Sequence, residues 1–401
     1  MLTYEDALAQ ILGQTQTLAP VQTPLAEALG LILAEDLRTF HDLPPFDNSS
    51  MDGFAVHAAD IADAGTVLPV QGDIAAGALS IPTLMPNMAL RIMTGAPLPE
   101  GADTVVPVED TEARANGTAF LEAVETGRHI RRRGEEVRSG IVVVPKQSRL
   151  RPAEIGMAAT VGRAQVLAHP KPRVAVLSTG DELVEPGTPL QRGQIYNSNA
   201  YALAAQVAES GGVVTRRLHA RDTPDALRAA FDQCARADVL ITSGGVSVGD
   251  FDYVKAVFAE RGTVDFWRVA IRPGKPLAFG QWGSTLFFGL PGNPVSSMVT
   301  FELFVRPTLR KLAGHSALAR PEVTVRLAEE VFHTPGRRSY QRAIVSRESS
   351  GYLARTTGAQ GSGMLRSMVL ANALLVLPSD TAVFPAGTEL SALLLDENDS
   401  S

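Results

Sequence analysis

The sequence has a single cysteine, Cys234, among 401 residues. One cysteine cannot form a disulfide within the chain, and no cluster of cysteine and histidine suggests a zinc site. Cys234 falls in an expected helix over Pro224–Ala235, where a free cysteine usually acts as a small buried hydrophobe rather than as a nucleophile. The composition therefore disfavours thiol catalysis and structural zinc.

Long apolar runs are also missing, since no stretch reaches the ~18 residues of a membrane-spanning helix. The opening MLTYEDALAQIL is acidic and lacks the basic segment of a signal peptide, so we expect a cytoplasmic protein without a membrane anchor. A basic excess is absent too: the formal net charge is −7, which argues against nucleic-acid binding. The run Arg128–Glu136 is a local exception, either a solvated face or an attraction for an anionic substrate.

No P-loop of the form GxxxxGK[ST] occurs, which disfavours ordinary NTPase chemistry. A different glycine-rich stretch occurs at Asp238–Lys255, DVLITSGGVSVGDFDYVK. Its first residues predict a buried strand, and Asp250–Arg261 has the apolar spacing of a helix. Between them lie the small residues Ser243, Gly244, Gly245, Ser247 and Gly249.

A strand, a glycine loop and a helix in this order direct unpaired backbone N–H groups and the positive end of a helix dipole at one point. An anion such as a phosphate can bind there. Asp250 and Asp252 stand at the same point and would repel a phosphate unless a cation lay between them. The hypothesis is a phosphorylated ligand held with Mg²⁺, although such loops are often purely structural.

The length predicts two to four domains. We expect helices in residues 1–38, the first beginning at Thr3 and docking on the α/β domain, the second over Pro24–Asp36. Residues 39–139 are broken by proline and glycine into short extended pieces, which indicates an inserted β-rich domain. The helical part resumes at 140–169 as a linker domain with a helix from Pro152. Residues 317–401 predict a small C-terminal β-barrel.

Residues 170–316 alternate strands with helices, which predicts a parallel sheet covered on both faces. Ligands of such sheets bind at the carboxyl ends of the strands. The polar residues of this region fall at those ends: Ser178, Thr179, Gly180 and Glu182 after the first strand, Asp222 after the second, and Pro291, Gly292, Asn293 and Pro294 after the last.

Converging carboxylates at ~4 Å would repel by ~4 kcal/mol per pair at an effective dielectric of ~20, so a cation must offset them or some point elsewhere. Asp222 precedes Thr223-Pro224 and could equally belong to a helix-capping turn. Arg272 and Lys275 bracket a Pro-Gly turn that is either a solvated basic turn or a pair of contacts to an oxyanion.

Eight segments of the chain are FDNSSMDGFA, RIMTGAPLP, GADTVVPVED, IRRRGEEV, STGDEL, TSGGVSVGDFDYVK, RPGKPLAFG and GLPGNPVS, and a further one is SGMLRSMVLANALLVLP. In this order and spacing they closely resemble the molybdopterin molybdenumtransferase family, which includes MoeA and the gephyrin E domain. The resemblance runs nearly end to end.

The resemblance implies an enzyme of molybdenum cofactor biosynthesis. It would take adenylylated molybdopterin and molybdate as substrates, release AMP with Mg²⁺ and insert molybdenum at the dithiolene. It also implies a multidomain α/β plus β fold with a molybdopterin-binding α/β domain. A homodimer whose subunits share each active site is expected, with the molybdopterin adenylyltransferase and cofactor-accepting proteins as further partners.

By motif match, the resemblance places the family's catalytic positions at Asp52, Thr94, Glu182, Asp222 and Asp252. Glu182, Asp222, Asp250 and Asp252 are the candidate Mg²⁺ ligands. Arg272 stands where many members carry lysine. Two other interpretations stay open: a molybdopterin adenylyltransferase, against which the extra domains argue, and a receptor-clustering scaffold, for which no linker is readable.

Overall fold

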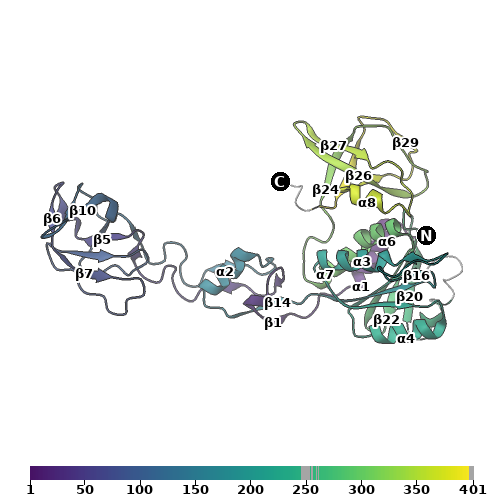
Figure 1. Ribbon diagram of the computed structural model, residues 1–401, viewed down its shortest axis with the longest axis horizontal. Helices are drawn as coiled ribbons and strands as arrows, with labels where there is room; N and C mark the ends of the chain where they lie inside the picture. Colours follow the sequence, from purple (N-terminus) through teal and green to yellow (C-terminus); the bar gives the residue numbers. More distant parts are fainter. Residues whose placement is uncertain (245–252, 254–255, 259, 261, 397–401) are drawn as a thin grey trace. The chain divides into compact units, whose positions relative to one another are not determined.

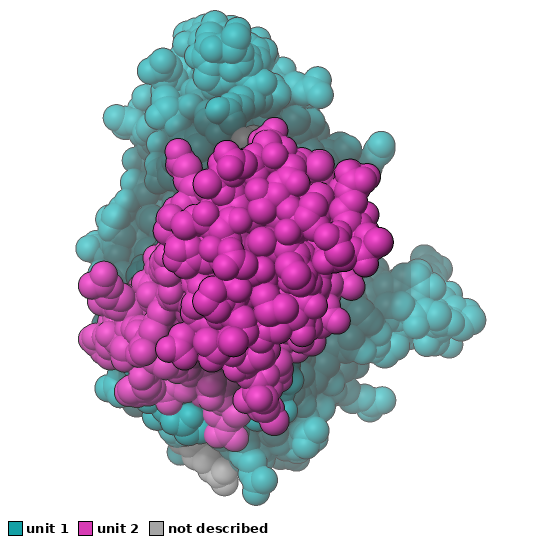
Figure 2. All heavy atoms as spheres, turned by 90° about the vertical axis from the view of Figure 1, so that its left-hand side faces the viewer, with its two compact units in different colours: residues 1–34, 149–151, 166–401 teal, residues 35–148, 152–165 magenta. Residues whose placement is uncertain are grey.

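The computed structural model describes residues 1–401 except 245–252, 254–255, 259, 261 and 397–401. The chain divides into two compact units, drawn in different colours in Figure 2. Unit 1 comprises residues 1–34, 149–151 and 166–401, and unit 2 comprises residues 35–148 and 152–165. The finer division into four domains by residue number stays a prediction. Among the described residues no helix has the length and apolar character needed to cross a membrane.

A six-stranded sheet forms the centre of unit 1 (Figure 1), in the order β18-β15-β19-β23-β22-β20. The first four strands are parallel, as the sequence predicts, whereas the edge is mixed: β22 pairs antiparallel with β23, and β20 pairs antiparallel with β22. The strand bounds are β15 Arg173–Thr179, β18 Val213–Ala220, β19 Val239–Ser243, β20 Gly262–Arg268, β22 Pro276–Trp282 and β23 Thr285–Leu290.

Alternate residues of β15 separate the two cores of this domain. Val174 and Val176 belong to a core with α1, α3, α6 and α7, while Ala175 and Leu177 belong to a second core with α4. Cys234 lies in that second core, where burial raises the pKa of its thiol to about 11 and keeps it neutral. The helices are α1 Tyr4–Gln14, α3 Ser198–Glu209, α4 Pro224–Cys234, α6 Pro294–Thr300 and α7 Arg306–Leu312, with the π-helical turn η4 Phe301–Val305 between the last two.

The N-terminal region confirms one expected helix and corrects another. Thr3 caps α1, accepting a hydrogen bond from the Asp6 backbone N–H at 3.1 Å and donating to the Asp6 carboxylate at 2.7 Å. The helix expected over Pro24–Asp36 is wrong, because Gly30 adopts a left-handed φ of 81° that interrupts it. The structure instead has β1 Val21–Pro24, a 3₁₀ turn η1 Leu25–Glu27, β2 Ile32–Leu33 and β3 Leu37–Arg38.

The buried β2 pairs with β14 Gln165–His169, which also pairs with β1. Strand pairing, rather than a helical face, therefore uses the apolar residues of this segment. The expected helix from Pro152 is confirmed as α2 Pro152–Thr160. Residues 140–169 thus contain strands as well as the expected helix.

Unit 2 is built from short strands, in agreement with its proline- and glycine-broken sequence. A four-stranded sheet has the order β7-β8-β5-β9, and a three-stranded sheet has the order β10-β11-β6. Gly53 lies where a Cβ would come within 2.0 Å of the Val106 carbonyl oxygen, so no other residue fits there. The bounds are β4 Asn48–Ser49, β5 Gly53–Val56, β6 Val67–Leu68, β7 Val70–Ile74, β8 Ala89–Ile92, β9 Thr104–Pro107, β10 Thr111–Arg114, β11 Gly117–Phe120, β12 Ile130–Arg131 and β13 Val142–Val144.

The C-terminal region is a closed five-stranded barrel, as predicted. Its strands follow the order β26-β27-β24-β30-β28, and a further pairing of β28 with β26 closes it. Its interior is apolar and includes Val325, Ala343 and Leu375. The bounds are β24 Glu322–Leu327, β26 Arg338–Glu348, β27 Gly351–Thr356, β28 Ala373–Leu377 and β30 Glu389–Leu394.

Candidate active site

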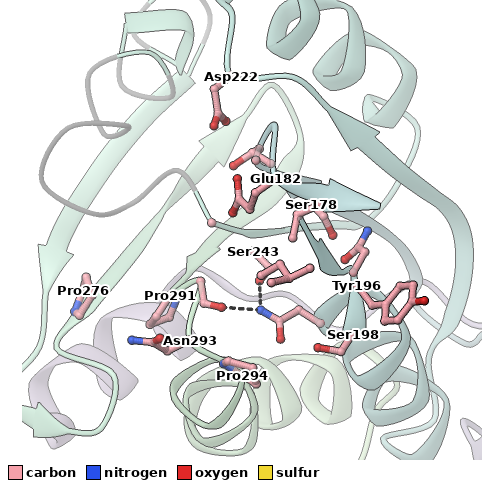
Figure 3. Close-up of a pocket in the computed structure, with 18 residues that line it drawn as sticks. Ser178, Glu182, Tyr196, Ser198, Asp222, Ser243, Pro276, Pro291, Asn293 and Pro294 are labelled. Atoms are coloured by element: carbon pink, nitrogen blue, oxygen red, sulfur yellow. Dashed lines mark hydrogen bonds between the residues drawn. The ribbon is translucent and has the colours of Figure 1, made fainter. Parts of the chain in front are cut away.

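A cavity of about 390 Å³ lies at the carboxyl ends of β15, β19 and β23 (Figure 3). This is the sheet edge at which the sequence predicts ligand binding. The cavity brings together eleven of the predicted site residues: Ser178, Thr179, Gly180, Glu182, Asp222, Ser243, Gly244, Pro291, Gly292, Asn293 and Pro294.

Two carboxylates, those of Glu182 and Asp222, line this cavity and lie toward the same side of it in Figure 3. The expected capping turn is present, because the Thr223 side chain caps α4 by accepting from the Ala226 backbone N–H at 3.3 Å, and Asp222 directly precedes this cap while lining the cavity. The Glu182 carboxylate folds back over Gly180, where a Cβ would come within 2.7 Å of either carboxylate oxygen. The cavity therefore has an acidic side built by two separate strand ends.

Buried hydroxyl groups stand next to this acidic side. Ser178 Oγ and Thr179 Oγ1 are enclosed, and neither has a hydrogen-bond partner among the described residues. An unpaired buried hydroxyl costs about 1–3 kcal/mol, so each of these two groups still has a hydrogen bond to make. The Gly244 backbone lies close by, with room for no Cβ, since one would meet the Thr179 carbonyl oxygen at 2.7 Å.

A polar segment at the start of α3 completes the cavity wall, and the sequence analysis does not single it out. Asn197 caps the helix, accepting from the Ala200 backbone N–H. Asn199 instead turns to the strand ends and hydrogen-bonds Ser243 Oγ and the Gly292 carbonyl. The sequence offers only a weak sign of this role: Asn199 is a second amide side chain just after the N-cap residue Asn197. The other unpredicted lining residues are Leu183, Ile195, Tyr196, Ser198 and Pro276.

Arg272 and Lys275 line a different cavity, of about 760 Å³, between the α/β domain and the barrel. They do not share a cavity with Ser178 and Thr179, although Pro276 lines both. Two further cations, Arg337 and Arg342, join them from the barrel, and the described residues that line this cavity include no aspartate or glutamate. This second cavity is therefore basic, whereas the first has an acidic side.

Arg342 is the most unusual of these cations, because only 1% of it is exposed. It donates hydrogen bonds to Ser367 Oγ at 3.0 Å and to the Gly361 carbonyl at 3.2 Å, both of which are neutral acceptors. Burial lowers the pKa of its guanidinium to about 10. Among the described residues, this buried arginine has only neutral acceptors as side-chain partners. Its positive charge therefore favours an anionic ligand.

Asp52 and Thr94 lie together in unit 2. Asp52 Oδ1 accepts from the Thr94 backbone N–H at 2.7 Å and from the Thr94 hydroxyl at 2.8 Å. These two hydrogen bonds, the backbone one first, hold the pKa of the Asp52 carboxyl below its ordinary value. Asp52 is therefore an exposed, ionised carboxylate with a fixed orientation.

The remaining predicted residues, Gly245, Ser247, Gly249, Asp250 and Asp252, lie outside the described residues. Within the described part of the chain, no group of three or more aspartate, glutamate, histidine or cysteine residues could hold a metal ion. Glu182 and Asp222 alone still suit Mg²⁺, which commonly binds to one or two carboxylates and completes its shell with water and substrate phosphate.

The fold and the two cavities define a multidomain protein with one cavity at an acidic sheet edge and a second, basic cavity beside the C-terminal barrel. Three family descriptions match the chain: "MoeA N-terminal region (domain I and II)" over residues 2–162, "Probable molybdopterin binding domain" over 175–311 and "MoeA C-terminal region (domain IV)" over 324–395. The chain belongs to the MoeA family.

Relatives similar to this chain include molybdopterin molybdenumtransferase 2 of Mycobacterium tuberculosis, 42% identical over 92% of this chain and 94% of the relative. The molybdopterin molybdenumtransferase of Haemophilus influenzae is 38% identical over 96% of this chain and 97% of the relative. Among solved structures, the molybdopterin biosynthesis MoeA protein of Pyrococcus horikosii covers 99% of both chains at 31% identity with a TM-score of 0.81.

Proposed function

We propose that this protein is an enzyme of molybdenum cofactor biosynthesis that inserts molybdenum from molybdate into adenylylated molybdopterin and releases AMP. The observation that carries the proposal is the first cavity, where Glu182 and Asp222 stand beside the unpaired hydroxyls of Ser178 and Thr179. Membership of the MoeA family supports the same assignment.

In this proposal the hydroxyls of Ser178, Thr179 and Ser243 donate hydrogen bonds to the phosphate oxygens of the bound nucleotide. Glu182 and Asp222 hold Mg²⁺, with Asp250 and Asp252 as further candidate ligands. When bound, Mg²⁺ neutralises the charge that develops as the phosphoanhydride breaks. The chain supplies position and electrostatics, and no covalent intermediate on the protein is required.

The basic cavity serves the second substrate. Four cationic donors line this cavity, and its described lining has no carboxylate to compete with a ligand: Arg272, Lys275, Arg337 and Arg342. Molybdate is a divalent oxyanion and suits such donors. Because Pro276 lines both cavities, the two substrates would bind next to each other. We therefore assign the pterin nucleotide to the acidic cavity and molybdate to the basic one.

Unit 2 also contributes to catalysis in this proposal. Asp52 and Thr94 are both exposed, so a ligand can reach the pair. The two hydrogen bonds between them fix the orientation of the Asp52 carboxylate. We propose a homodimer in the cytoplasm in which this pair serves the active site of the partner subunit. The molybdopterin adenylyltransferase and cofactor-accepting proteins are its proposed further partners.

The test is to incubate the purified protein with adenylylated molybdopterin, Mg²⁺ and molybdate and to quantify AMP by chromatography. We expect AMP release that requires Mg²⁺ and falls about 100-fold or more in Glu182→Gln, which removes one carboxylate charge from the proposed metal site. Asp181→Asn is the matched control, because Asp181 adjoins Glu182 but does not line the cavity, and it should act like wild type.

Two results would overturn this function. The first is consumption of ATP with molybdopterin and no AMP release from the adenylylated form, which would indicate an adenylyltransferase. The second is equal activity of Glu182→Gln and Asp181→Asn, which would remove the acidic side of the cavity from the mechanism.

A further inference from the structure

The Asn199 side chain joins two loops that border the acidic cavity. Its Nδ2 donates to Ser243 Oγ at 2.8 Å and to the Gly292 carbonyl oxygen at 2.7 Å, the two dashed lines of Figure 3. Ser243 ends β19 and leads into the glycine loop, whereas Gly292 follows β23. One amide on α3 is therefore hydrogen-bonded to the ends of two neighbouring strands, β19 and β23.

The orientation of this amide is fixed by its partners. The Gly292 carbonyl can only accept a hydrogen bond, so the NH₂ group, and not the oxygen, must face it. The second N–H of the same group then points to Ser243 Oγ, which acts as the acceptor. A serine hydroxyl that accepts in this way keeps its own proton for another partner.

Ser243 is 3% exposed and lines the cavity, so its proton has few directions available. The two loops are also close at the backbone. The Gly244 N–H donates to the Leu290 carbonyl at 3.3 Å, and a Cβ on Gly292 would lie 3.7 Å from the Gly244 Cα. A small shift of either loop would therefore move the hydrogen-bond donors that face the cavity, and Asn199 contacts both loops at this point.

We propose that Asn199 is a positioning residue that holds Ser243 with its O–H group directed at a phosphate oxygen of the bound nucleotide. The inference rests on the function proposed above and adds a residue to it. Asn199 acts through Ser243: removing the amide frees the hydroxyl to rotate, so the ligand loses a donor that is still present in the chain.

The test is a double-mutant cycle read by calorimetric binding of adenylylated molybdopterin in the absence of molybdate. Asn199→Ala and Ser243→Ala should each weaken binding about tenfold, as expected for loss of a hydrogen bond to a charged group. If Asn199 acts through Ser243, the double variant should also be weakened about tenfold rather than about 100-fold. Thermal unfolding of each variant checks that the fold is retained.

Asn199→Asp provides a second measurement in a side chain of the same shape. Its carboxylate has no N–H for Gly292 and accepts the Ser243 proton, which turns that proton away from the ligand. We expect binding weaker than in Ser243→Ala, because the added charge also repels phosphate, and a partial recovery of affinity at acidic pH, where the new carboxyl is protonated.

The outcomes separate the two proposals. Independent, multiplicative effects of Asn199→Ala and Ser243→Ala, or wild-type affinity in Asn199→Asp, would overturn the positioning role alone. Tight binding by the wild type without AMP release on adding Mg²⁺ and molybdate would overturn the proposed function and leave the positioning role standing. Absence of any binding by the wild type would overturn both.

Discussion

Arg342 carries the assignment of molybdate to the basic cavity. It lies on β26 and lines that cavity. Among the described residues, its side chain donates hydrogen bonds only to neutral acceptors. Arg342→Gln keeps a polar side chain and removes the charge, so it should raise the KM for molybdate tenfold or more, the range expected for a charge-assisted hydrogen bond. The KM for adenylylated molybdopterin should change little.

The measurement is AMP release at varied concentrations of each substrate. Arg347→Gln is the matched control, since Arg347 lies on the same strand at an exposed position outside the cavity. Equal KM values for molybdate in Arg342→Gln and Arg347→Gln would show that Arg342 has only a structural role.

At the scale of elements, the π-helical turn η4 between α6 and α7 places a buried acid, Glu302, against two arginines. Arg320 donates to Glu302 at 2.8 Å and to Glu209 at 2.6 Å, and Arg306 lies 3.9 Å from Glu302. Gln206 also donates to Glu302 at 2.7 Å. Removing one member of such a buried network leaves uncompensated charge, which costs about 3–5 kcal/mol.

We therefore expect Glu302→Gln to lower the free energy of unfolding of the α/β domain by about 3 kcal/mol or more. Urea unfolding followed by tryptophan fluorescence measures this domain, because Trp267 and Trp282 both belong to it. Asp225→Asn removes a charge from an exposed ion pair with Arg228 on α4 of the same domain and should cost much less. Similar costs for the two variants would contradict the network's role.

The elements also show what sequence reasoning could predict and where it ended. Apolar runs such as Val174–Leu177 and Leu240–Ile241 have few alternatives to buried parallel strands, so the sheet and its ligand-binding edge were predictable. The Pro24–Asp36 segment has apolar residues at helical spacing, which favours a helix. In the structure it forms strands, because Gly30 interrupts a helix and β14 offers a pairing partner. That partner lies more than 130 residues away in the sequence, so the local pattern could not predict the pairing.

The same limit applies to the candidate site. Glu182 and Asp222 are polar residues at strand ends, so topology predicts that they meet. Asn199 and Arg342 carry no such local signal. In the sequence, Asn199 looks like an ordinary residue at a helix start, and only the structure shows that it contacts two loops. Arg342 looks like a polar position of an alternating strand, and only the structure shows that it lines a cavity.

For the whole molecule, the decisive question is which copies of the chain supply one active site. Asp52 belongs to unit 2 and Glu182 to unit 1, and we propose that a site combines Asp52 of one subunit with Glu182 of the other. Asp52→Asn and Glu182→Gln homodimers should each be inactive. A heterodimer of the two variants would then have one site with both lesions and one site with neither, so it should recover about half of the wild-type rate.

Co-expression with two different affinity tags isolates this heterodimer, and AMP release measures its activity. If Asp52 and Glu182 serve the same site from a single chain, every site in the heterodimer retains one lesion and no recovery occurs. A control heterodimer of Glu182→Gln with Asp222→Asn places both lesions in unit 1, where Glu182 and Asp222 line one cavity of one chain. It should stay inactive, so recovery confined to the first pair assigns the Asp52–Thr94 pair to the partner's site.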